Sequence, residues 1–172
     1  WKTYGELFTM MALAELPAPL RTLIRILGPL MFKDPITRAG ARVASAGLKR
    51  YFMILEQRDA LVAALERFFG DYDAWITPVT PAPAFLHRKM GKIHTPIDVD
   101  GRKIPGNIGG IGYTCPFNLT GHPAVLMPLT LTREGLPLGV QLVGPLWGDM
   151  DLLNAAEALS QITPAFTPPP MK

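Results

Sequence analysis

The chain has 172 residues with a formal net charge of +3, and 48% of them are hydrophobic while only 18% are charged. This length suffices for one domain with a hydrophobic core, but the surface of a small domain normally carries about a quarter or more charged residues, so part of the apolar surface is expected to face another segment or partner. The basic residues are scattered, which argues against a nucleic-acid interface. All uncharged runs are shorter than the roughly 18 residues that span a membrane, which argues against a transmembrane helix. The single cysteine excludes an internal disulfide.

Three separate helical patterns lie within the first 70 residues. A helix is expected from Lys2 to Glu15, and because Trp1 is not a methionine and the pattern starts at once, the sequence is expected to be cut from a longer one. Apolar residues then recur at helical spacing over residues 20–30, where Gly28-Pro29 is expected to break or kink the helix. A longer helix is expected over residues 44–69, closed by Gly70-Asp71. Its apolar side comprises Leu48, Phe52, Leu55, Leu61, Val62, Leu65 and Phe69.

Short apolar runs in the second half predict buried strands. Residues 74–77 form such a run and lead through Pro78 into an extended loop. Residues 124–131 and 138–143 predict two more strands, joined by a turn at residues 133–135. Asp149 is expected to be the N-cap of a last helix that ends near Ile162. Strands that alternate with helices predict one α/β layered domain.

Residues 84–112 mix glycine, proline and charged residues without a sustained period, which predicts a long surface excursion with a turn at Asp100-Gly101. Glycines 106, 109, 110 and 112 lack the lysine and hydroxyl residue of a phosphate-binding loop. A mobile or closely packed loop that shapes a pocket is the better interpretation. His87, His94 and His122 have no acidic or cysteine cluster around them and are not expected to bind a metal.

The residue types that could act as nucleophiles are few. Ser45 and Ser160 lie in helical patterns without the glycines of a nucleophile elbow, so both are interpreted as packing or surface residues. Cys115 has no evident helix N-terminus beside it to lower its pKa. A buried, small hydrophobic side chain is favoured for it over a reactive pair with His122.

Three segments carry a resemblance to a known family when they are taken in order. They are Asp73 to Pro83, Thr114 to Pro128 and Gly135 to Gly144, and residues 45–162 as a whole resemble the amidase signature family, serine hydrolases that cleave carboxamide bonds. The resemblance implies the C-terminal portion of a single α/β/α amidase domain whose mixed, mostly parallel central sheet is flanked by helices. Residues 1–43 would be a helical, cap-like segment, and residues 44–172 the core of sheet and helices.

The resemblance also implies where the chemistry lies. The family uses a serine nucleophile, a second serine after a cis peptide bond and a lysine base, and none of these maps onto this chain. We therefore expect no catalytic residue, metal or cofactor here, and the chain alone is predicted to be inactive. Its implied contribution is one wall of the acyl pocket, formed by Thr80, Ile108, Ile111, Tyr113, Thr114 and Phe117. Asn118, Gly121, Pro123 and Gln141 match positions interpreted as structural, for loop geometry and backbone hydrogen bonds.

Two comparisons within the family bear on the substrate. The glutamyl-tRNA amidotransferase branch has an acidic residue where Ile111 stands, which argues against a charged amino-acid amide. Residues 20–32 resemble the cap helices of the fatty acid amide hydrolase branch, which suggests an apolar acyl amide and a peripheral membrane contact through residues 16–32. The other interpretation is that these helices pack within the enzyme or at a homodimer contact.

Two classes of function remain open. The chain is either the C-terminal half of an amidase, whose partners are the missing N-terminal half and a small-molecule amide, or a non-catalytic truncated or split chain that acts as a partner-binding scaffold. Nucleic acid is not expected as a partner. The expected location is the cytoplasm, with membrane association left open.

Overall fold

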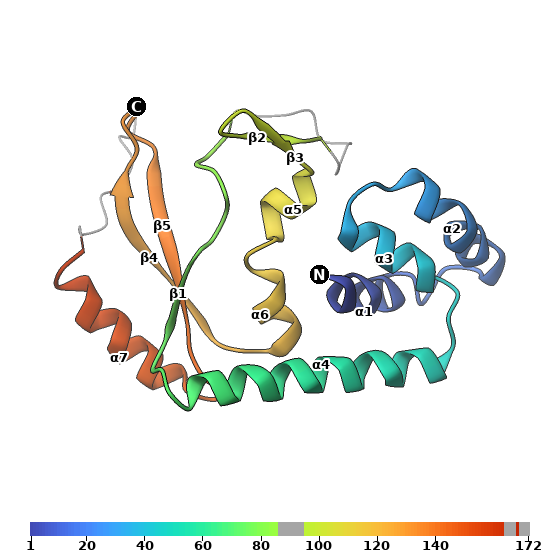
Figure 1. The fold of residues 1–172 in the computed structure, drawn as a ribbon, viewed down its shortest axis with the longest axis horizontal. Coiled ribbons are helices and arrows are strands. Elements are labelled where there is room, and N and C mark those ends of the chain that lie inside the picture. The colour runs from blue at the N-terminus through green and yellow to red at the C-terminus, as the bar shows by residue number, and fades with distance from the viewer. Residues whose placement is uncertain (86–94, 164–167, 169–172) are drawn as a thin grey trace.

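The computed structural model describes residues 1–85, 95–163 and 168 and confirms the α/β class. The longest helix, α4 (Leu48–Phe69), runs along one side of the molecule. Three helices lie over its N-terminal half, and a small sheet stands at its C-terminal end, with two short helices between them (Figure 1). None of the described helices is both long and apolar enough to cross a bilayer.

The N-terminal bundle comprises α1 (Lys2–Ala12), α2 (Ala18–Met31) and α3 (Pro35–Val43). The expected break at Gly28-Pro29 is wrong, because the Phe32 amide still donates to the Gly28 carbonyl at 2.8 Å and the helix continues to its end. A proline inside a helix removes the hydrogen bond of its own missing N–H and crowds the carbonyl group four residues earlier, but α2 continues past Pro29 to Met31.

Helix α3 was not among the expected elements, although its N-terminus carries a recognisable signal. Asp34 is the N-cap, and its Oδ1 accepts a hydrogen bond from the Thr37 amide at 2.7 Å. Pro35 follows at the first helical position, where its fixed φ suits a helix and its missing N–H costs nothing. An aspartate directly followed by proline therefore marks this start.

The backbones of helices α1 and α3 come close together where the two helices cross. A Cβ atom on Gly5 would lie against the Ile36 carbonyl oxygen and 2.9 Å from its carbonyl carbon. A Cβ atom on Gly40 would lie 2.6 Å from the Gly5 carbonyl oxygen. Glycine at both positions is thus a steric requirement of this crossing.

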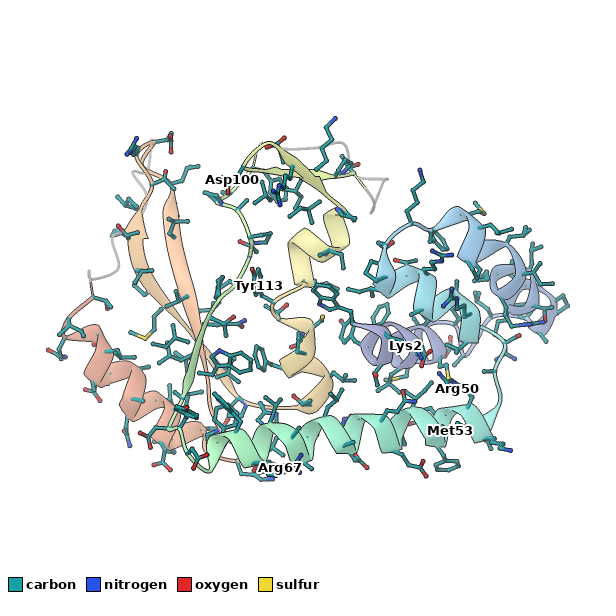
Figure 2. The ribbon with its side chains drawn as sticks, in the orientation of Figure 1. Lys2, Arg50, Met53, Arg67, Asp100 and Tyr113 are labelled. Carbon is teal, nitrogen blue, oxygen red and sulfur yellow. The ribbon has the colours of Figure 1, made fainter. Side chains whose placement is uncertain are left out.

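A buried ion pair joins α1 to α4. Arg50 extends from α4 toward α1 (Figure 2), and its Nη2 donates to Oε2 of Glu6 at 2.6 Å. Glu6 is 2% exposed, whereas Arg50 remains partly exposed. A charge-assisted hydrogen bond of this length fixes the orientation of the bundle on α4.

Replacing Arg50 with alanine is expected to lower the free energy of unfolding by about 2–3 kcal/mol, because the carboxyl group of Glu6 would stay buried without its partner. Denaturant unfolding measures this loss. The matched control is Lys49→Ala on the neighbouring, exposed position, which should change stability by less than about 0.5 kcal/mol. Equal losses in the two variants would contradict a role for the ion pair.

The expected apolar side of α4 is confirmed in its C-terminal half, where Phe69 is buried and Val62 and Leu65 are half-buried. It is wrong for three residues that are exposed, and it missed Ile54, which is completely buried. The exposed residues are Leu48, Phe52 and Leu61. The helix begins at residue 48, after Gly47, rather than at residue 44. It packs against α1 and α6, and Phe68 and Phe69 at its C-terminal end also contact β1 and β5. Periodicity alone cannot tell which of several apolar stripes a long helix buries.

The main sheet has the order β1-β5-β4, with β1 (Trp75–Pro78), β4 (Ala124–Leu131) and β5 (Pro137–Val143). The expected β4–β5 turn is confirmed, with Gly135 at φ +81°. Both strand pairs are antiparallel, so the mostly parallel pairing implied for the whole sheet is not found among the described strands of this chain.

Helix α7 (Asp149–Ser160) covers one face of this sheet. Met127 and Leu142 pack there against Leu152 and Ala156. The N-cap is Gly148 rather than the expected Asp149, which instead lies in the first turn. The expectation of buried strands is wrong for β1 and for β4, in which Thr77 and Met127 respectively are the only buried residues. Burial depends on what packs over each face, which an apolar run does not encode.

The stretch expected to be a surface excursion contains ordered elements. Strands β2 (Ile97–Val99) and β3 (Arg102–Ile104) form an antiparallel hairpin. Its tip confirms the expected turn, since both turn residues, Asp100 and Gly101, have positive φ. Two unpredicted helices follow, α5 (Gly106–Ile111) and α6 (Cys115–Thr120). Residues 86–94, including His87 and His94, lie outside the described residues.

Candidate functional site

The Gln141 side chain joins two segments that the sequence analysis assigned to the pocket wall. It is buried on β5, and its Nε2 donates to the Pro78 carbonyl at the end of β1 and to the Tyr113 carbonyl between α5 and α6, both at 3.1 Å. An amide nitrogen has two protons, so one glutamine satisfies both carbonyls. The structural role expected for Gln141 is therefore confirmed.

The wall residues other than Phe117 lie on the two segments that Gln141 joins. Thr80 follows β1, and its hydroxyl donates to the Ala82 carbonyl at 2.7 Å. Ile108 and Ile111 lie on α5 and are half-buried. Tyr113, with an exposed side chain, lies where α5 meets α6 (Figure 2). Thr114 donates from Oγ1 to the Ile111 carbonyl at 3.3 Å. Their contact with a substrate stays a prediction.

Phe117 occupies a different environment from the other wall residues. Its side chain is 6% exposed and belongs to a buried cluster with Phe69 and Val143. Its ring meets Trp75 edge to face, with the centroids 5.7 Å apart. Phe117 therefore packs as a core residue, with its ring against neighbouring aromatic side chains.

Close packing, one of the two expectations for the glycines of residues 106–112, holds for Gly109 and Gly112 but not for Gly110, where a Cβ atom would meet nothing within 4 Å. These residues form α5 and its C-cap rather than a loop. A Cβ atom on Gly109 would lie 2.5 Å from Cδ1 of Ile97 on the hairpin. The Gly112 carbonyl accepts a hydrogen bond from the indole of Trp1 at 2.9 Å. Helix α5 is thus held against both the hairpin and the start of α1.

Cys115 is completely buried, as expected, although it begins α6, contrary to the expectation that no helix starts beside it. Burial raises the pKa of its thiol; the N-terminal ammonium group and its own backbone amide act in the opposite direction. Sγ lies 3.9 Å from the Gly112 carbonyl. A protonated, enclosed thiol is a poor nucleophile.

We expect Cys115 to react with iodoacetamide at least about 100-fold more slowly in the folded protein than in the unfolded chain, because only unfolding of the surrounding structure exposes the thiol.

The raised pKa of the Cys115 thiol stabilises the fold below the unfolded thiol's pKa of about 8.5, and this contribution is lost as the pH rises through the higher folded value. The free energy of unfolding should therefore decline in alkaline solution, and Cys115→Ala should remove that decline. Fast labelling of the folded protein would contradict this assignment.

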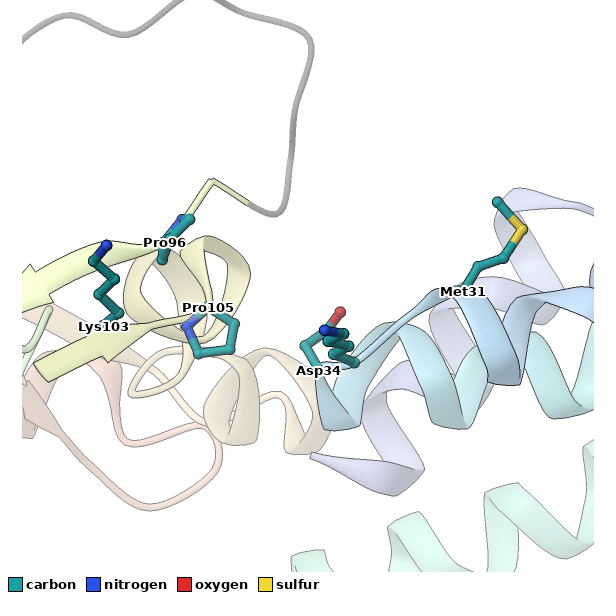
Figure 3. Close-up of a pocket in the computed structure, with 6 residues that line it drawn as sticks. Met31, Asp34, Pro96, Lys103 and Pro105 are labelled. Carbon is teal, nitrogen blue, oxygen red and sulfur yellow. The ribbon is translucent and has the colours of Figure 1, made fainter.

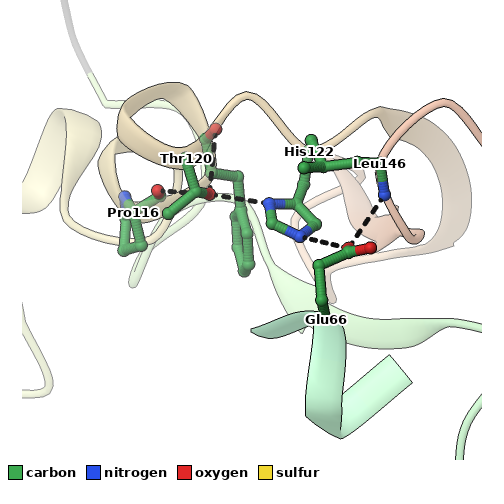
Figure 4. A network of polar contacts seen from close by, with 6 residues as sticks. Glu66, Pro116, Thr120, His122 and Leu146 are labelled. Atoms are coloured by element: carbon green, nitrogen blue, oxygen red, sulfur yellow. Dashed lines mark hydrogen bonds and ion pairs between the residues drawn. The ribbon is translucent and has the colours of Figure 1, made fainter. Parts of the chain in front are cut away.

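A polar network that sequence reasoning missed surrounds His122 (Figure 4). Nδ1 lies 2.9 Å from Oγ1 of Thr120, and Nε2 lies 3.0 Å from Oε1 of Glu66 on α4. The same carboxylate oxygen accepts the Leu146 amide at 3.0 Å. His122 therefore does not pair with Cys115. No local signal could reveal this network, because Glu66 and His122 are 56 residues apart.

A cavity of about 260 Å³ lies between the α2–α3 loop and the β2–β3 hairpin (Figure 3). It is lined by Met31, Lys33, Asp34, Pro96, Lys103 and Pro105. None of the predicted wall residues lines it, so it is separate from the Gln141 junction. Among the described residues there is also no group of three or more metal-ligating side chains.

The two serines of the chain occupy the ordinary positions expected for them. Ser45 is half-buried directly after α3, and Ser160 donates from Oγ to the Glu157 carbonyl at 2.6 Å on α7. Neither lies on a strand-to-helix turn of the kind that exposes a nucleophile. The described residues thus form an α/β arrangement in which neither serine occupies the position of a nucleophile elbow.

Comparison with known proteins identifies the family. A family model described as Amidase matches residues 31–153, and the chain belongs to this amidase family. It is 32% identical over 135 residues to the A chain of the glutamyl-tRNA(Gln) amidotransferase of Halothermothrix orenii, covering 76% of this chain and 26% of the relative. It is 34% identical over 146 residues to the corresponding chain of Zymomonas mobilis, covering 82% and 27%. The chain thus spans about a quarter of the length of these curated relatives.

Solved structures show the same fold. A crystal structure of an amidase superposes with a TM-score of 0.64 at 23% identity, over 94% of this chain and 36% of that one. A bacterial aryl acylamidase of the amidase signature family superposes with a TM-score of 0.64 at 19% identity, over 92% and 32%. The short antiparallel sheet seen here is therefore a portion of a larger amidase fold.

Proposed function

We propose that this chain is the C-terminal portion of an amidase domain and forms one wall of the pocket for the acyl group. Residues 1–43 would be its cap-like segment and residues 44–172 its part of the core. The observation that carries the proposal is the Gln141 junction, which holds the segments of Thr80 and Tyr113 together in a chain of the amidase family.

The proposed chemistry is hydrolysis of a carboxamide C–N bond by a Ser-Ser-Lys mechanism whose residues lie outside this chain. The buried state of Cys115 and the engaged state of His122 support the assignment of the attacking hydroxyl elsewhere. Residues here would orient the substrate: Ile108 and Ile111 offer apolar contact, and the hydroxyl of Tyr113 offers a hydrogen bond. Specificity would then depend on the α5–α6 junction.

Two substrate classes are suggested by the names of similar proteins, a glutamyl-tRNA(Gln) amidotransferase and an aryl acylamidase. We favour an apolar acyl amide, because Ile111 stands where the amidotransferase branch carries an acidic residue. A half-buried isoleucine cannot pair with a substrate ammonium group. Comparing hydrolysis of an apolar acyl anilide with that of glutamine separates the two classes.

The decisive experiment has two arms. The chain alone should hydrolyse neither substrate, whereas the chain produced together with an upstream segment carrying a Gly-Gly-Ser-Ser-Gly-Gly-like loop and a lysine should release the aniline. In the active pair, Tyr113→Ala should raise KM at least about tenfold, the effect of losing one good contact. Tyr72→Ala, an exposed tyrosine directly after α4, is the matched control. Turnover by the chain alone that Cys115→Ala abolishes would overturn the proposal.

A second candidate is a non-catalytic chain that binds a partner. Exposed leucines on β4, including Leu126 and Leu131, favour it, because a strand of this composition is normally covered. Reading the coding sequence upstream of Trp1 separates the candidates, since an in-frame lysine followed by the serine-rich loop would establish the amidase. Its absence would favour the scaffold.

Membrane or homodimer contact through α2 is a separate proposal. Leu23, Leu27 and Leu30 all expose their side chains, and Leu30 is 82% exposed. Replacing the three with glutamine should lower liposome binding at least about 100-fold if the helix inserts its apolar face, since each buried leucine contributes about 1.5–3 kcal/mol. Unchanged binding together with a lower sedimentation coefficient would instead indicate the homodimer.

A further inference from the structure

The hydrogen bonds around His122 differ between the neutral and the cationic state of its ring. The Leu146 amide donates to Oε1 of Glu66, so this oxygen is an acceptor, and the His122 Nε2 that faces it at 3.0 Å must carry a proton. On the other side of the ring, Nδ1 faces Oγ1 of Thr120 at 2.9 Å. A hydroxyl has one proton, and the position of that proton depends on Nδ1.

The Thr120 hydroxyl has two places for its proton. Its Oγ1 lies 3.0 Å from the Pro116 carbonyl oxygen and 3.4 Å from that of Phe117. If the imidazole is neutral, its bare Nδ1 accepts the hydroxyl proton, and the Pro116 carbonyl loses this partner. If the imidazole is cationic, Nδ1–H donates to Oγ1, and the hydroxyl is free to donate to Pro116. The two protonation states therefore differ in the group to which the Thr120 hydroxyl donates.

We propose that His122 and Thr120 form a proton-linked relay, in which uptake of one proton by His122 turns the Thr120 hydroxyl from Nδ1 to the Pro116 carbonyl. The proton enters at Nδ1, and Nε2 keeps its proton throughout. Because Pro116 lies in the first turn of α6, the charge of His122 is transmitted to the helix that follows the Gln141 junction. Its relevance to the pocket wall rests on the proposed function.

The surroundings hold this relay in place. His122 is enclosed, with a side chain that is 0% exposed, and its ring lies beside Phe69. The charged groups that the described residues bring to this corner come from α4. They are Glu66 and Arg58, whose Nε donates to the Leu119 carbonyl at 2.8 Å, with Asp59 paired to Arg58. The Arg58 bond fixes the C-terminal end of α6, so the hydroxyl can reorient without moving the helix.

Nuclear magnetic resonance can test the relay without any turnover. In the ¹⁵N,¹³C-labelled protein, imidazole ¹⁵N shifts and the Pro116 carbonyl ¹³C shift are followed from about pH 5 to about pH 8. We expect Nε2 to stay protonated, Nδ1 to gain its proton as the pH falls, and the Pro116 signal to change with the same midpoint. The signals of His122 are assigned by their loss in His122→Gln.

Two variants of Thr120 separate the relay from a direct effect of charge. Thr120→Ser keeps the hydroxyl and should keep the coupled change at Pro116. Thr120→Val has nearly the same shape but no hydroxyl, so the Pro116 signal should become independent of pH. The proposal is overturned by a Pro116 signal that is constant in the unmodified protein or persists in Thr120→Val. The proposal is also overturned if the neutral ring is protonated on Nδ1, or if the His122 signals do not change with pH. If the valine variant fails to fold, the signals of the unmodified and the serine proteins still test the proposal.

Discussion

Replacing Gly5 with alanine is expected to lower the free energy of unfolding by about 3 kcal/mol, at the upper end of the range for overpacking. The added methyl group would meet the Ile36 carbonyl group, which is backbone and cannot rotate away, so α1 and α3 must separate. Alanine would otherwise favour a helix by up to about 1 kcal/mol over glycine. Steric overlap therefore outweighs helix propensity.

Thermal unfolding measures this effect. A loss of about 3 kcal/mol corresponds to a fall in Tm of about 6–12 °C for a domain of this size. Gly110→Ala is the matched control, since Gly110 also lies in a helix but a Cβ atom there would meet nothing within 4 Å. The control should be neutral or slightly stabilising. Similar losses in both variants would show that the crossing of α1 and α3 is not the cause.

Replacing Gln141 with leucine is expected to cost about 2–3 kcal/mol, because the carbonyls of Pro78 and Tyr113 would lose their shared donor. The substitution keeps the size of the side chain, so a cavity does not explain the loss. Denaturant unfolding measures it, and Gln57→Leu on the exposed side of α4 is the matched control, with a change below about 0.5 kcal/mol.

A second variant at this position tests the hydrogen bonds themselves. Gln141→Glu would place an ionised carboxylate against two carbonyl oxygens, so its loss at neutral pH should exceed that of the leucine variant. Burial beside acceptors raises the pKa of the introduced carboxyl above its unfolded value of about 4.3, so stability should recover as the pH falls toward that value. A loss that is independent of pH would contradict the assignment of donor and acceptors.

The family resemblance and much of the secondary structure were predictable from local signals. The β4–β5 connection was found because Gly135 lies in a turn between two apolar runs, and the tip of the β2–β3 hairpin was found from Asp100-Gly101. Helix α3 was missed although Asp34-Pro35 carries a start signal. These features depend on a few neighbouring residues, which is the range over which turn and cap preferences act.

The environment of the predicted wall was less accessible to sequence reasoning. The three segments that resemble the amidase signature family follow one another in the family's order, and this placed Thr80 and Tyr113 in the same region. Gln141 was correctly given a structural role. Its two partners, however, lie 63 and 28 residues away and became visible only in the fold. Phe117 was assigned to the wall, but it packs in the core against Trp75.

The sequence by itself determined the family, the helices and turns, and the lack of a recognisable nucleophile elbow, because each of these follows from residue order and short-range backbone preferences. Only the tertiary structure decided which apolar faces are covered, which glycines meet a neighbouring backbone, and that Glu66, His122 and Thr120 form one network. Such contacts join residues distant along the chain, and their energies depend on the packing of whole elements. The relay at His122 is therefore a property of the fold.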